Sequence, residues 1–169
     1  MASVLAILAG GVSEIDKKRR KARLFRWLSL YPPFLGAGIR VVAVAPDLTS
    51  LEVRMKLTFW NRNYVGTHFG GSLYSLTDPF YMLLLMEALG PDYIVWDKEA
   101  VVRFKRPGRG TVTARFEMPP ERVAEIRAAA DAQYKVEPTF LVSVVDAAGE
   151  VVAEVEKLLY VRRKDRRAS

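Results

Sequence analysis

The feature that most constrains the fold of this chain is a short segment without any polar face. Residues 80–86 read FYMLLLM, so a helix formed there would be apolar on every side. Such a helix must be covered all round, yet these residues are far too few to cross the ~30 Å hydrocarbon layer of a bilayer. We therefore expect protein to surround this segment, as the central helix of a domain.

Strand patterns lie on both sides of that segment. Between Leu51 and Phe59, apolar residues alternate with polar ones, the period of a strand with one wet face. Further strands are predicted at 39–45, 96–106, 111–116, 140–145 and 151–161, and further helices at 17–30 and 120–130. An antiparallel sheet curled around one central helix accommodates this order, which makes the predicted fold class α+β.

The 169 residues suit one well-packed domain, and the net charge of +7 is concentrated near the chain ends. Six cations lie between Lys17 and Arg23, and five between Arg162 and Arg167. Neither run interleaves with aromatic residues as a nucleic-acid-binding surface would, so no nucleic-acid partner is expected. We predict an N-terminal extension with a basic helix start at 1–25, a single domain at 26–163 and a basic tail at 164–169.

The chain has no cysteine and one histidine, His68. This excludes disulfides, thiol nucleophiles and zinc sites built from nitrogen and sulfur ligands, and we expect neither a metal nor a cofactor. An apolar stretch at 4–12 precedes the basic run, the reverse of a secretory signal, so a cytoplasmic location is expected. Apolar residues at 24–31 could contact a membrane, but we favour a helix packed on the domain surface.

Residues 63–78, NYVGTHFGGSLYSLTD, combine paired glycines with one carboxylate. A helix opened by Gly70 and Gly71 would leave backbone N–H groups free at its N-terminus, where an anion is favoured. Asp78 follows about two turns later, on nearly the same helical face. An oxyanion site and a general base beside one cleft are the parts needed to hydrolyse an acyl group.

These residues also carry a family resemblance, which extends from about Arg26 to Arg163. The sequence resembles the hotdog-fold acyl-CoA thioesterases, above all the phenylacetyl-CoA-type group and its tetrameric branch. The resemblance rests on Asn63, Gly66, His68, Gly70, Gly71 and Asp78, and on the segments WNRNYVGTHFGGSLYSLTDPFYMLLLME, IVWDKEA and LLYVRRK.

The resemblance implies a hotdog fold and a homodimer with active sites at the subunit interface, assembled into a homotetramer. It implies acyl-CoA as substrate, with coenzyme A present only as part of that substrate. Catalytic roles then fall on Asp78 and Asn63, and oxyanion binding on Gly70 and Gly71. In the family a histidine directly precedes the glycine pair, whereas here Phe69 does and His68 lies one position earlier. His68 is therefore a secondary candidate.

Each of these residues has a simpler interpretation. Because Asp followed by Pro is a typical helix start, Asp78 could merely cap a helix that begins at Pro79. Asn63 could end a strand, the glycines could form a tight turn, and His68 could be a loop histidine. Four cations around a strand end and its Gly-rich turn suit the phosphates of coenzyme A, although alternating cations also occur on any wet sheet face. They are Arg103, Lys105, Arg106 and Arg109.

Two other functions compete with thioester hydrolysis. Asn63-x₄-His68 has the spacing of the Asp-x₄-His pair of hotdog enoyl-CoA hydratases and dehydratases, but an amide cannot replace the carboxylate as a base. The same cavity could also serve a non-catalytic acyl-CoA or lipid binder. Hydrolysis is the prediction that uses both the glycines and Asp78.

Overall fold

The structure is a computed structural model that describes residues 14–165. The apolar stretch at 4–12 lies outside these residues, as do parts of the predicted N-terminal extension and basic tail. Within residues 14–165, no helix combines the length and the apolar character needed to cross a bilayer.

Six strands form one antiparallel sheet with the spatial order β1-β2-β4-β5-β6-β3. They are β1 (Ile39–Val44), β2 (Ser50–Lys56), β3 (Tyr93–Phe104), β4 (Thr111–Glu117), β5 (Thr139–Asp146) and β6 (Val151–Arg163). In β2, the apolar residues Leu51, Val53 and Met55 are buried, as their alternation predicts. The sheet has two edges, β1 and the longer β3.

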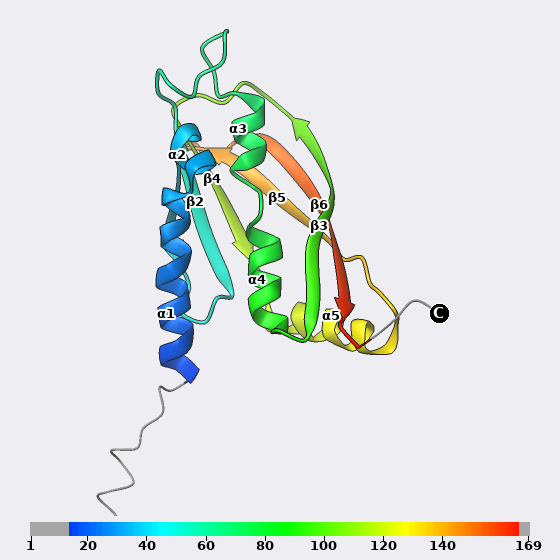
Figure 1. The fold of residues 1–169 in the computed structure, drawn as a ribbon. Helices are drawn as coiled ribbons and strands as arrows, with labels where there is room; N and C mark the ends of the chain where they lie inside the picture. Colours follow the sequence, from blue (N-terminus) through cyan, green and yellow to red (C-terminus); the bar gives the residue numbers. More distant parts are fainter. Residues whose placement is uncertain (1–13, 166–169) are drawn as a thin grey trace, which may run out of the picture.

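Two consecutive helices, α3 (Gly70–Ser75) and α4 (Phe80–Leu89), lie within the curve of the sheet (Figure 1). The remaining helices are α1 (Glu14–Trp27), the short 3₁₀ helix η1 (Leu28–Leu30), α2 (Pro32–Ala37) and α5 (Pro120–Ala132). Pro32 and Pro33 follow the first helical region and open α2, since proline fits the first helical positions. A curved antiparallel sheet around a central helix is the α+β hotdog fold expected from the resemblance.

Helix α4 contains the apolar segment predicted to be central. Phe80, Leu84 and Leu85 are completely buried, and the Phe80 ring centroid lies 5.1 Å from that of Phe116 on β4. Burial on every side, however, is not reached within one chain. Met86 on the same helix is 43% exposed, so one apolar face of α4 is left open.

Helix α1 packs against β1 at the edge of the sheet and buries Ala22 and Phe25 (Figure 1). Its outward side chains Leu24 and Trp27 are exposed. The helix is therefore packed on the domain surface through one face, as predicted, while a second apolar face points to solvent.

Candidate active site

The helical segment inside the sheet is interrupted between α3 and α4, and Asp78 lies in this interruption. Helix α4 begins at Phe80, its N-cap residue is Pro79, and no side chain caps it. The peptide bond between Asp78 and Pro79 is cis. The carboxylate of Asp78 therefore does not cap the following helix and is used elsewhere.

That carboxylate is paired with a lysine that enters from β6. Lys157 Nζ donates a hydrogen bond to Asp78 Oδ1 at 2.6 Å and lies 3.0 Å from Asp97 Oδ1. It also donates to the hydroxyl of Tyr74 at 3.5 Å. Four side chains from α3, the interruption, β3 and β6 thus form one polar cluster under the sheet, which we call the Lys157 cluster: Tyr74, Asp78, Asp97 and Lys157.

Burial differs strongly within the Lys157 cluster. The Lys157 side chain is 1% exposed, whereas that of Asp78 is 40% exposed. Burial alone would lower the pKa of Lys157, but its bonds to Asp78 and Asp97 outweigh this, so its pKa is raised. Burial raises the pKa of Asp97 despite the opposing effect of Lys157. Asp78 is the more exposed of the two carboxylates in the cluster, since the Asp97 side chain is 21% exposed.

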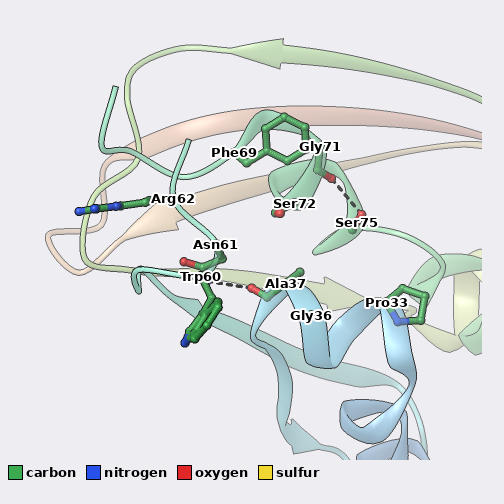
Figure 2. A pocket seen from close by; sticks show the side chains of 10 residues that line it. All are labelled: Pro33, Gly36, Ala37, Trp60, Asn61, Arg62, Phe69, Gly71, Ser72 and Ser75. Atoms are coloured by element: carbon green, nitrogen blue, oxygen red, sulfur yellow. Dashed lines mark hydrogen bonds between the residues drawn. The ribbon is translucent and has the colours of Figure 1, made fainter. Parts of the chain in front are cut away.

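The glycine pair opens α3, so the N–H groups of its first turn have no acceptor within the helix. Gly71 is exposed and lines a pocket of about 480 Å³ between α3, α2 and the loop after β2 (Figure 2). The pocket combines aromatic, cationic and hydroxyl side chains, and Asp78 is not among its lining residues. These are Pro33, Gly36, Ala37, Trp60, Asn61, Arg62, Phe69, Gly71, Ser72 and Ser75.

Asn63 is occupied within its own loop. Its side-chain amide donates to Thr67 Oγ1 at 2.9 Å and to the His68 carbonyl at 3.3 Å, and its Oδ1 accepts from backbone N–H groups at 65 and 67. His68 is buried, and its Nε2 lies 3.0 Å from the Gly110 carbonyl oxygen. Because a carbonyl can only accept, Nε2 carries the proton of this histidine. No hydrogen bond joins Asn63 or His68 to Asp78.

Three of the four predicted coenzyme A-binding cations pair with acids of β5 and β6. Lys105 lies 2.7 Å from Glu154, and Arg106 lies 2.8 Å from Asp146. Arg103 lies 3.9 Å from Glu156. Arg109, in the turn between β3 and β4, is exposed and has no ion pair within residues 14–165. In the same range, no three His, Asp or Glu side chains come together as ligands for a metal ion.

Comparison with protein families gives one match that covers most of the chain. Residues 21–161 match the family described as "Domain of unknown function (DUF4442)". The chain belongs to the DUF4442 family. No curated protein matches this DUF4442 protein significantly.

Solved structures share its fold. A Pseudomonas aeruginosa protein named "Probable Thioesterase" is 25% identical, with a TM-score of 0.73 over 83% of this chain and 95% of the other. A Haemophilus influenzae thioesterase is 14% identical, with a TM-score of 0.62 over 88% and 94%. A mutant of the Thermus thermophilus phenylacetic acid degradation protein PaaI is 24% identical, with a TM-score of 0.52 over 78% and 98%. These similarities confirm the resemblance of the DUF4442 protein to hotdog-fold thioesterases.

Sequence reasoning did not identify Lys157 and Asp97 as site residues of this DUF4442 protein. A signal was present, because Val155, Leu159 and Val161 mark one face of β6 as buried, and Lys157 occupies that face. Asp97 likewise follows the buried Val95 by two residues on β3. A charged residue at an inward position of a strand indicates a polar cluster beneath the sheet.

Proposed function

We propose that this protein hydrolyses acyl-CoA thioesters and that Asp78 takes a proton from the attacking water. One observation carries the proposal. The Asp78 carboxylate does not cap α4; it accepts a hydrogen bond from the buried Lys157 at Oδ1, and its side chain remains 40% exposed. A carboxylate in that position can accept a proton from water. The fold shared with the Pseudomonas and Haemophilus thioesterases supports the same reaction class.

In the proposed step, the water oxygen adds to the thioester carbonyl carbon while Asp78 accepts a proton. The C–S bond then breaks, and the leaving thiolate takes up this proton, which yields a carboxylic acid and free coenzyme A. N–H groups of Gly70 and Gly71 would bind the oxygen that becomes negative; one such donor contributes about 10²–10³ in rate. The reaction needs only water and the thioester, so no cofactor belongs to the proposal.

We further propose that two copies of the chain complete each site, in a homodimer that pairs again into a tetramer. Asp78 does not line the pocket beside Gly71, and in the proposed dimer the partner copy brings these two parts of the site together. The open face of α4 at Met86 and the exposed Val101 and Phe104 on the edge strand β3 supply an apolar surface for the partner.

The test is thiol release from a panel of short-chain, long-chain and aryl CoA esters, for the wild type and Asp78→Asn. We expect Asp78→Asn to remain folded and to lose about 10²–10⁴ in kcat. Asp92→Asn is the matched control, because Asp92 is an exposed carboxylate beyond the other end of α4. Unchanged hydrolysis by Asp78→Asn would contradict the proposed base. Tight acyl-CoA binding without turnover across the panel would instead favour a non-catalytic binder.

A further inference from the structure

Lys157 is an unusual residue for the core of a sheet. Its neighbours on the inward face of β6, Val155 and Leu159, are completely buried, and Lys157 is buried with them. Removing an ammonium group from water is costly, and the cost is offset only when its donors find good acceptors. The residues around Lys157 must therefore supply oxygen atoms that stabilise its buried ammonium group.

The ammonium group has three N–H donors, and three oxygens surround it. Asp78 Oδ1 is at 2.6 Å, Asp97 Oδ1 at 3.0 Å and Tyr74 Oη at 3.5 Å. These oxygens come from three separate parts of the chain: α3, the interruption after it and β3. Lys157 thus links the segment that bears Asp78 to two strands of the rigid sheet.

The Lys157 cluster contains two carboxylates for one ammonium group. If the cluster served only to fill space, one acid would be enough, and apolar side chains of similar volume would often give equal or greater stability. Asp97 is instead a second carboxylate 3.0 Å from the same ammonium group, in a partly buried position; burial raises its pKa, and the ammonium group of Lys157 opposes this rise. This second carboxylate offsets the positive charge that Lys157 would otherwise impose on Asp78.

We propose that Lys157 is a positioning residue for Asp78 and that Asp97 balances its charge. Lys157 fixes Oδ1 of Asp78, which leaves Oδ2 for the attacking water. Asp97 shares the ammonium group, so Asp78 is oriented without losing its capacity to accept a proton. This inference rests on the proposed hydrolysis. It also has a test that does not depend on activity.

The first test removes the charges of Lys157 and Asp97 together. Lys157→Met alone would leave two carboxylates facing each other without a cation, so it is combined with Asp97→Asn. The double variant keeps similar volumes, and we expect it to fold and to lose at least about tenfold in kcat, with little change in KM. Lys98→Met is the control, since Lys98 forms an exposed ion pair with Glu137 at 2.8 Å. Wild-type kcat in the double variant would overturn the positioning role.

The second test uses Asp97→Asn alone. The titratable groups in contact with Asp78 or its partner are Tyr74, Asp97 and Lys157, from α3, β3 and β6. Without the negative charge at 97, the ammonium group of Lys157 interacts with Asp78 alone and stabilises its charged form more strongly. The acidic limb of the pH profile of kcat/KM should therefore move to lower pH. A structural role alone predicts loss of stability without this shift.

The third measurement is carboxyl-carbon NMR titration, which needs no substrate. The charge of Asp78 raises the pKa of Asp97, so the Asp97 signal should titrate at lower pH in Asp78→Asn than in the wild type, and an unchanged midpoint would refute charge balancing by Asp97. The outcomes also separate the two proposals. If Asp78→Asn is inactive and the double variant is fully active, only the positioning role fails. If Asp78→Asn is fully active, the proposed base fails, and the titration still decides the role of Asp97.

Discussion

His68 Nε2 lies 3.0 Å from the carbonyl oxygen of Gly110, and this bond ties the loop before the glycine pair to the turn between β3 and β4. A backbone bond from the His68 N–H to the Gly108 carbonyl, at 3.0 Å, strengthens the same link. His68 Nδ1 is buried and has no hydrogen-bond partner within the described residues. A proton added at Nδ1 would therefore be left unpaired in the folded state.

This arrangement predicts a pH dependence of stability that comes from one residue. Burial lowers the pKa of His68 below 6.5, despite the opposing bond to Gly110. The unfolded chain thus binds this proton more readily than the folded chain, so the free energy of unfolding should fall as pH decreases from about 7.5 to 5.5. Urea unfolding at several pH values measures this. Since His68 is the only histidine, His68→Gln should lack this dependence, and an identical slope in that variant would refute the assignment.

Local sequence patterns predicted the strands and helices, but not the contacts between them. The strand periodicity of β2 and the apolar run of α4 depend on each residue's own surroundings, and both elements begin within one residue of the predicted position. Their ends differ, since β2 ends at Lys56 rather than at 59 and α4 continues to Leu89 rather than to 86. Contacts between residues that are distant in the sequence cannot be predicted from such patterns. Asp78 meets Lys157 because β6 passes under the interruption between α3 and α4, a contact over 79 positions that no local pattern encodes.

The open face of α4 has the same origin. An all-apolar segment indicates that something must cover Met86, but not whether the same chain or a second copy does so. Similarly, the resemblance implies a catalytic role for Asn63, but the bonds of Asn63 to Thr67 and His68 depend on how the loop folds back on itself.

A side chain at Gly71 is expected to displace the Phe69 ring that lines the pocket. A Cβ there would lie 2.5 Å from Cε1 of Phe69, whose ring is 57% exposed and can move aside. Gly71→Ala should therefore fold, while the displaced ring lowers kcat/KM by about tenfold or more. Gly36→Ala is the control, since a Cβ at this other pocket residue meets nothing within 4 Å. Equal activity of the two variants would show that the pocket around Gly71 and Phe69 has no role in catalysis.

Arg109 is expected to bind a phosphate of coenzyme A, because within the described residues it is the predicted cation without an acidic partner. Arg109→Ala should raise KM for an acyl-CoA by up to about fivefold, the value of one exposed ion contact, and leave kcat unchanged. A matching acyl-pantetheine thioester, which lacks the nucleotide phosphates, should show no difference. Arg115→Ala, which removes an exposed arginine paired with Glu117 at 3.1 Å, is the control. A KM increase for both substrates would place Arg109 at the acyl end of the site.

The open face of α4 predicts the effect of a charge on assembly. Met86 is 43% exposed within a single chain, so Met86→Lys should leave the monomer folded, but it would bury an unpaired ammonium group if a second copy covers α4. If the proposed dimer forms through this face, sedimentation should show its loss, and thioesterase activity should fall with it because the proposed site combines residues of both copies. Leu35→Lys is the control, since Leu35 is 57% exposed on α2, a helix that contacts β1, at the opposite edge of the sheet from β3. An intact dimer in Met86→Lys would show that the partner does not cover this face of α4. A fully active monomer would show that one chain contains the complete site.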